Sequence, residues 1–195
     1  MNNDLSKKIV DKVTGELRPI KIGIFDIETT GLEAYFDIVI CASIIDVKGK
    51  IKTFKINDYL YPSTLEDYGL TKTIVEELDK YDLLIGWYSS GFDFKFLNTR
   101  ALIHNLKPPD RNYRRDLCFI SRANLQLRNN KLATINQSIF GKSHKTFLRP
   151  EIRRAAIRGE KWAIDFYVDH CEWDVRDTLR TYKKFMPLLG KLKKG

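Results

Sequence analysis

The stretch IGIFDIETTGL at residues 22–32 decides the fold that we expect for this chain. Its apolar first part predicts a buried strand over residues 21–27. Asp26 and Glu28 are two positions apart, so on a strand their side chains point to the same face. Burial and mutual repulsion both disfavour the charged forms of two such carboxylates, and a folded protein tolerates them when a cation neutralises them. The pair therefore indicates a site for Mg²⁺ or Mn²⁺, which prefer oxygen ligands, rather than a solvent-facing pair on an edge strand.

The pattern around this strand predicts an α/β domain in which helices flank a mixed central β-sheet. Two further strands follow, joined by a hairpin-type turn at Lys48-Gly49-Lys50, so the first part of the chain is an antiparallel meander. Ser63 and Glu66 resemble a capping box at the start of the first helix. We expect strands over residues 21–27, 38–47, 51–56, 83–87 and 113–119, and helices over residues 63–81, 92–106, 132–140, 150–158 and 161–189.

The length of 195 residues and the hydrophobic fraction of 43% suit one domain with one core. We expect a polar, loosely structured segment at residues 1–18, a single domain at residues 19–190 and a basic tail at residues 191–195. The net charge of +9 favours a polyanionic partner. The three cysteines have neither disulfide nor zinc spacing, and from the polar N-terminus and the lack of long apolar runs we expect neither a signal peptide nor a membrane-spanning segment. These features predict a soluble, cytoplasmic protein that binds no membrane.

A third acidic residue, Asp93, begins a predicted helix in the sequence GFDF at residues 91–94. Taken by itself, Asp93 would be interpreted as a helix cap. The strand that precedes it, however, would bring it to the same end of the sheet as Glu28. Asp93 is therefore a candidate member of the same site.

The last helix contributes a further acidic residue and a histidine. His170 and Asp174 are four positions apart and so share one face of this helix. Asp174 flanks the apolar stripe, which places it near the core. Spacing alone does not distinguish it from the other acids of the segment, such as Asp177, which we expect to be solvated.

Together these segments resemble the motifs of the DEDD superfamily of 3′–5′ exonucleases, which have a ribonuclease H-like fold. FDIETTGL is similar to the first motif, SSGFDFKFL to the second and HCEWDVRDT to the third, and the resemblance spans residues 21–187. Two positions depart from the pattern. His170 has the spacing of the tyrosine found in one branch of the family, which makes the chain most similar to stand-alone relatives of family-B polymerase proofreading domains. Tyr88 stands where relatives often have asparagine.

The resemblance implies a two-metal mechanism of phosphodiester hydrolysis with Mg²⁺ or Mn²⁺. Asp26 would bridge both ions, Glu28 and Asp174 would complete the first site, and Asp93 would hold the second, largely through waters. His170 would orient or deprotonate the attacking water, as a histidine of ordinary pKa can do near neutral pH. The alternative is that His170 only packs on its helix.

The resemblance also implies where the substrate lies. Thr29, Thr30, Gly31 and Leu32 would contact the terminal nucleotide through their backbone and the Leu32 side chain. Among the aromatic residues of the second motif, Tyr88 is the candidate for base stacking. Lys145 lies in a basic loop at residues 141–146 that is either a phosphate track or a solvated surface.

Three classes of function fit these features. The first is a 3′–5′ exonuclease acting on a single-stranded 3′ end of DNA or RNA. The second is a structure-specific endonuclease on the same fold, since fold does not settle function. The third is a non-catalytic nucleic-acid-binding module, against which the presence of all four carboxylates argues. The sequence does not identify a protein partner.

Overall fold

The computed structural model describes residues 8–11, 14–59, 67–110, 113–144 and 146–189. A five-stranded sheet in the order β5-β4-β3-β6-β7 forms its centre. β3 pairs antiparallel with β4, and β4 with β5, whereas β6 and β7 run parallel to β3. The mixed sheet and its antiparallel first half are as predicted. The strands are β3 (Ile22–Thr29), β4 (Val39–Asp46), β5 (Ile51–Lys55), β6 (Leu83–Gly86) and β7 (Tyr113–Asp116).

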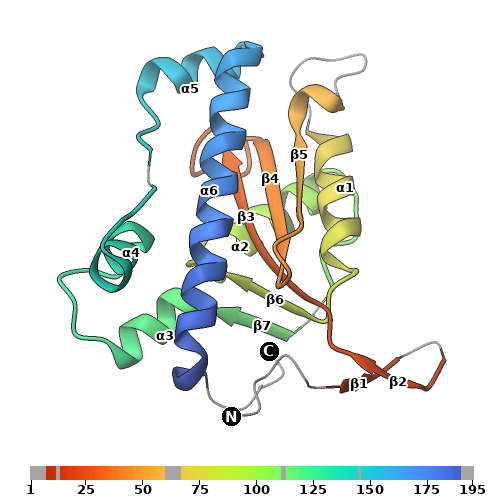
Figure 1. Ribbon diagram of the computed structural model, residues 1–195. Coiled ribbons are helices and arrows are strands. Elements are labelled where there is room, and N and C mark those ends of the chain that lie inside the picture. Colours follow the sequence, from red (N-terminus) through yellow and green to blue (C-terminus); the bar gives the residue numbers. More distant parts are fainter. Residues whose placement is uncertain (1–7, 12–13, 60–66, 111–112, 145, 190–195) are drawn as a thin grey trace.

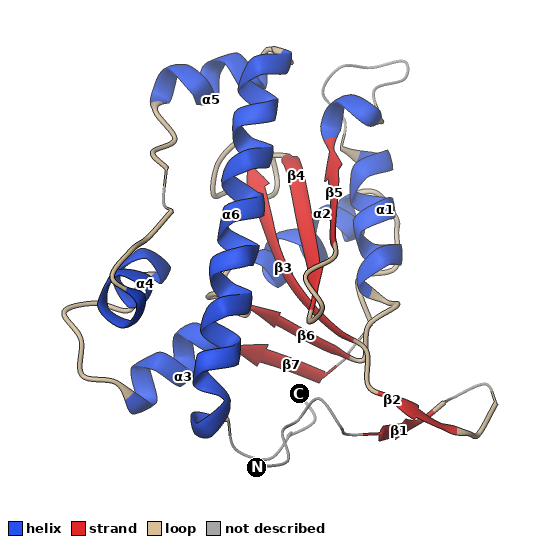
Figure 2. Ribbon diagram, viewed as in Figure 1, coloured by secondary structure: helices blue, strands red, loops and turns tan. Residues whose placement is uncertain are grey.

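Helices cover both faces of this sheet (Figures 1 and 2). The long helix α6 lies across one face, and α1 and α2 pack against the other (Figure 1). α5 leads into α6, and α3 and α4 lie between β7 and α5 in the chain. Within the described ranges, no helix is long and apolar enough to span a membrane. The helices are α1 (Tyr68–Leu78), α2 (Asp93–Ile103), α3 (Leu117–Asn124), α4 (Leu132–Phe140), α5 (Pro150–Ile157) and α6 (Lys161–Phe185), with short 3-10 turns at Ile56–Asp58 and Met186–Leu188.

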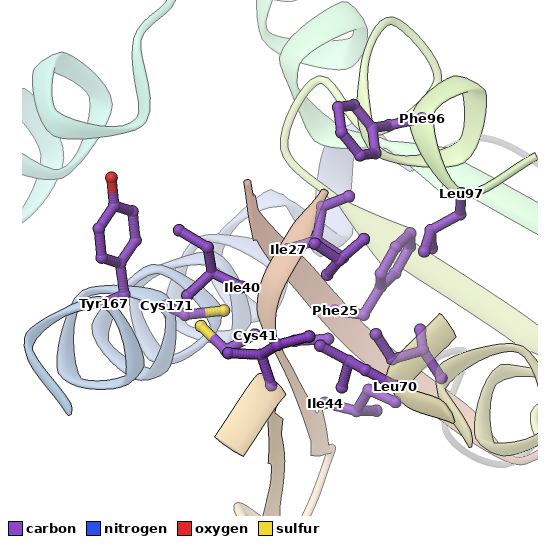
Figure 3. Close-up of a cluster of buried hydrophobic side chains, with 14 of the residues drawn as sticks. Phe25, Ile27, Ile40, Cys41, Ile44, Leu70, Phe96, Leu97, Tyr167 and Cys171 are labelled. Atoms are coloured by element: carbon purple, nitrogen blue, oxygen red, sulfur yellow. The ribbon is translucent and has the colours of Figure 1, made fainter. Parts of the chain in front are cut away.

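The alternation of β3 between its two faces positions the later site. Phe25 and Ile27 point to the α1 and α2 side, where Phe25 packs on Phe94 with ring centroids 4.8 Å apart. Figure 3 shows Phe25 and Ile27 on this side of β3 and Cys171 of α6 on the opposite side of the strand. Ile24 points the other way and packs in a cluster with Val175 of α6. Asp26 and Glu28 have the same parity as Ile24, so the strand period directs them toward α6.

Several element boundaries differ from the sequence expectation, and the following three are the most informative. α1 begins only at Tyr68, and the predicted capping box at residues 63–66 lies outside the described residues. The strand expected over residues 113–119 ends at Asp116, because this side chain accepts a hydrogen bond from the Cys118 N–H and so caps α3. α6 ends at Phe185 and gives way to a 3-10 turn that contains Pro187, which has no N–H to continue the helix.

Part of the N-terminal segment is ordered, contrary to the loose segment expected over residues 1–18. β1 (Lys8–Val10) and β2 (Leu17–Pro19) form an antiparallel hairpin. Arg18 links this hairpin to the main sheet. Its guanidinium donates one hydrogen bond to Asp11 and two to Asp82, which directly precedes β6. Long-range ion pairs of this kind carry no periodic signal in the sequence. The basic tail at residues 191–195 lies outside the described residues.

A buried ion pair joins α1, α2 and β4. Asp67 is fully buried and accepts hydrogen bonds from Arg100, at 2.6 Å, and from the Val39 N–H at 2.8 Å. His104 lies 2.7 Å from the same carboxylate. Burial by itself would raise the pKa of Asp67, but these hydrogen bonds outweigh it and hold the pKa below its usual value. The pair therefore depends on both partners being charged.

Replacing Arg100 by leucine should destabilise the protein by about 3–5 kcal/mol, because it leaves the Asp67 carboxylate buried without its main partner. Urea unfolding at about neutral pH measures the change in free energy of unfolding. The matched control is Arg158→Ala, which removes the exposed pair between Arg158 and Glu160 and should leave the free energy of unfolding nearly unchanged. Equal losses in the two variants would contradict the role assigned to the buried pair.

Candidate active site

The first two carboxylates lie where the sheet opens. β6 pairs with β3 only from Ile22 to Ile24, so the two strands separate before Asp26 is reached. The Ile27 N–H, which faces the opening, donates instead to Asp93 Oδ1 at 3.1 Å. Asp93 therefore begins α2 and also accepts a hydrogen bond from β3 through its buried carboxylate. The structure places Asp93 and Glu28 close enough to Asp26 for their charges to act on its carboxylate.

α6 brings the remaining two side chains over this opening. His170 Nε2 lies 3.5 Å from Glu28 Oε1 and 3.9 Å from Asp174 Oδ2. The four-residue spacing thus places His170 and Asp174 on the face of α6 that covers β3. The Cys171 thiol, next to His170, donates to the Asp26 carbonyl at 3.4 Å and fixes the helix against the strand. Asp26, Glu28, Asp93, His170 and Asp174 consequently form one cluster, which we call the acidic site.

Crowding shifts the protonation of the acidic site. Burial raises the pKa of Asp26 well above its ordinary value, and the nearby charges of Asp93, Asp174 and Glu28 raise it further. Burial, followed by the charges of Asp174 and Asp93, raises the pKa of Glu28 in the same way. Burial raises the pKa of Asp93 to about 7, although its hydrogen bond from the Ile27 N–H works in the opposite direction. Without a cation, this arrangement is electrostatically unfavourable.

The donor set fits a divalent cation. Glu28, His170 and Asp174 can each offer one ligand atom, and these atoms all lie within 4.8 Å of one another. Carboxylate oxygens suit Mg²⁺ and Mn²⁺, and a cation would remove the repulsion that raises the carboxylate pKa values. His170 belongs to this set, whereas the sequence assigned it only a role toward water.

Sequence reasoning missed Thr146. Its hydroxyl is hydrogen-bonded to His170 Nδ1 at 2.5 Å, so the opposite ring nitrogen faces the carboxylates. The loop that carries Thr146 is fastened to α6, because His144 bonds to Asp177 at 3.0 Å and stacks on Trp173 with ring centroids 4.1 Å apart. Asp177 is thus buried and paired rather than solvated as expected. A threonine in a basic loop carries no signal that would reveal this contact.

The predicted substrate residues separate into three groups. Thr29, Thr30, Gly31 and Leu32 line a pocket of about 380 Å³ beside Glu28, together with Phe92, Arg153 and Tyr167. Tyr88 is not part of this pocket and lies on the turn after β6. Lys145 lies outside the described residues.

Two details of the pocket wall explain its shape. Thr30 is buried and donates to Asp37 at 2.9 Å, so its side chain holds the turn together and leaves the backbone to face the pocket. A Cβ at Gly31 would lie 2.3 Å from Asp37 and 2.6 Å from Arg153. Close approach, rather than a positive φ, therefore explains this glycine. Leu32 is 81% exposed, which leaves its side chain available to a ligand.

A mixed sheet with an acidic site on its central strand is compatible with more than one activity, because fold alone does not settle function. The family model of the RNase H superfamily matches residues 24–186, and the chain belongs to this superfamily. This membership, together with the acidic site, supports nuclease activity in general.

Among solved structures, the fold is similar to the family B DNA polymerase from the hyperthermophilic archaeon Pyrobaculum calidifontis. The TM-score is 0.68 and the sequence identity 20%, and the match covers 89% of this chain. It covers only 25% of the polymerase chain, and at this identity the likeness concerns the fold. A comparison with curated proteins finds no match.

Divalent cations should stabilise the protein, and more so at about pH 8 than at about pH 5. The raised pKa values mean that the native state binds protons that the unfolded state does not. This contribution is complete below the unfolded pKa near 4 and is lost as the pH rises through about 7 for Asp93. Protons and the cation therefore compete for the carboxylates, and the cation stabilises the folded protein most at high pH. Thermal unfolding with Mg²⁺, with Mn²⁺ and with EDTA at both pH values measures the effect.

Asp26→Asn is the control for this measurement. It removes one of the repelling charges, so the variant in EDTA should unfold at a higher temperature than the wild type at about pH 8. Its response to added metal should be smaller. Equal metal-induced shifts at both pH values would show that the acidic site does not hold the cation.

Proposed function

We propose that this protein is a metal-dependent 3′–5′ exonuclease that hydrolyses single-stranded DNA or RNA. The convergence of five side chains from three distant segments in the acidic site carries the proposal. The resemblance of the three motifs to DEDD exonucleases supports the direction of cleavage, and the net charge of +9 supports a polyanionic substrate. The choice between DNA and RNA is left to experiment.

The acidic site would hold two Mg²⁺ or Mn²⁺ ions through Asp26, Glu28, Asp93 and Asp174. When bound, these ions neutralise the phosphate and lower the pKa of the attacking water. His170, whose Nδ1 is hydrogen-bonded to Thr146, would orient that water or accept its proton. The Ile27 N–H fixes the Asp93 carboxylate, so this side chain needs little rearrangement.

The pocket beside Glu28 would receive the 3′-terminal nucleotide. The backbone of the turn from Thr29 to Leu32 forms one wall, and the exposed Leu32 side chain offers an apolar contact for a base. Arg153 also lines the pocket, next to Gly31, and its guanidinium would approach a phosphate or a terminal hydroxyl. A pocket of this size beside the acidic site favours a chain end over an internal position.

Cleavage of 5′-labelled linear single strands of DNA and RNA tests the proposal. We expect a metal-dependent ladder that shortens from the 3′ end, and no ladder with Asp26→Ala. A circular single strand should resist, because it has no end. Cleavage of the circle would favour a structure-specific endonuclease, and binding without cleavage in Mn²⁺ would favour a non-catalytic module.

Thr146 should act through His170. Thr146→Val removes the hydroxyl at nearly constant volume and should lower kcat roughly 10–100-fold, the usual cost of losing a partner that orients a site residue. Thr146→Ser keeps the hydroxyl and should retain most of the activity. In a His170→Ala background the Thr146→Val change should have no further effect, because the ring that it orients is gone. Additive losses in the double variant would contradict this relation.

A further inference from the structure

Tyr88 adopts a backbone conformation that tyrosine rarely takes. Its φ is +62°, in the left-handed region that favours glycine and asparagine. A bulky residue persists in this region only where its surroundings impose it, and such residues concentrate at functional sites. The chain therefore tolerates a strained backbone at Tyr88, and this conformation positions an aromatic ring.

Asp116 imposes this conformation. Its Oδ1 accepts from the Tyr88 N–H at 2.9 Å, and its Oδ2 accepts from the Ser90 N–H at 2.9 Å. The same carboxylate caps α3 through the Cys118 N–H at 3.0 Å. One buried side chain thus holds the turn after β6 and the start of α3 in a fixed relation. Gly91 makes room for the ring, since a Cβ there would lie 2.3 Å from Tyr88 Cζ.

Because Asp116 holds the turn after β6 against the start of α3, two aromatic side chains form a small exposed surface. Tyr88 is 42% exposed and Phe119 is 45% exposed, and the centroids of their rings lie 5.9 Å apart. The guanidinium carbon of Arg122, one turn along α3, is 5.3 Å from each ring centroid. We call Tyr88, Phe119 and Arg122 the aromatic platform.

The platform lies at the catalytic edge of the sheet. Tyr88 follows β6 and Phe119 lies in α3 directly after β7, and both strands run parallel to β3, so their carboxyl ends lie on the same side of the sheet as that of β3, although β3 and β6 diverge beyond Ile24. The Tyr88 carbonyl accepts from the Phe92 N–H at 3.0 Å, immediately before Asp93. The platform and the acidic site are therefore connected by one short, hydrogen-bonded turn.

We propose that the aromatic platform is a second binding subsite, on which one base of the single-stranded substrate stacks while Arg122 contacts a neighbouring phosphate. The proposal rests on the proposed function, because it gives the same strand a second point of attachment. Aromatic faces beside a guanidinium bind single strands without sequence preference, since every base has a π-face. The platform is separate from the pocket beside Glu28, so it holds a nucleotide other than the terminal one.

A nucleic acid fits this surface better than a protein partner does. A stable protein interface buries about 800 Å² on each partner, far more than three side chains offer. The platform also combines flat apolar faces with a positive charge on a chain of net charge +9, which complements a phosphodiester strand. A protein partner would need further exposed apolar contacts around it.

Fluorescence anisotropy with a labelled oligothymidylate in EDTA tests the platform without hydrolysis. Tyr88→Gly removes the ring and suits the positive φ, so the variant should unfold at the wild-type temperature or above while binding about tenfold more weakly. Phe119→Ala should weaken binding to a similar extent. Trp162→Ala, which removes an exposed tryptophan at the start of α6, is the matched control and should bind as the wild type does.

An abasic scan identifies the stacked base. Placing one abasic linker at successive positions from the 3′ end should weaken wild-type binding at one internal position, and Tyr88→Gly should abolish that sensitivity. The proposal would be overturned by wild-type affinity in both platform variants, or by a scan that is sensitive only at the terminal nucleotide. Binding of a protein to the platform in place of the strand would also overturn it. Absence of hydrolysis with these binding results intact would reject the proposed function and leave the subsite standing.

Discussion

The repulsion among buried and partly buried carboxylates is the constraint to which the rest of the structure responds. Asp26 and Glu28 share a face of β3 because of the strand period, and α6 covers that face. The separation of β6 from β3 leaves the Ile27 N–H free to bind Asp93, which adds a third carboxylate. The site is thus unfavourable by itself, and apolar packing on both sides of the sheet supplies the stability that offsets it.

The periodic features of this fold could be predicted from the sequence, whereas the polar contacts between distant segments could not. The mixed sheet and its antiparallel first half follow from periodicity, and the motifs pointed to Asp26, Glu28, Asp93, His170 and Asp174, whereas the helix α3 was not expected. Helix and strand ends set by single hydrogen bonds, such as the cap on Asp116, were misplaced by a few residues.

The contacts that sequence reasoning missed have a common physical origin. Thr146 reaches His170 because His144 and Asp177 fasten its loop to α6, and Arg18 orders the N-terminal hairpin through Asp82. In each case two polar residues far apart in the chain pair once the fold has brought them together. Neither residue type nor local spacing encodes such a pairing, so only the folded geometry reveals it.

The alternation along β3 also constrains how this gene can change. A substitution in β3 alters one side chain, but the insertion or deletion of a single residue before Asp26 would turn both carboxylates toward Phe94 and bring Phe25 and Ile27 under α6. Length changes are tolerated far better in surface connections, such as the Lys48-Gly49-Lys50 turn between β4 and β5. Selection on this site must therefore preserve the alternation of side chains along β3, which depends on chain length, as well as the residue types.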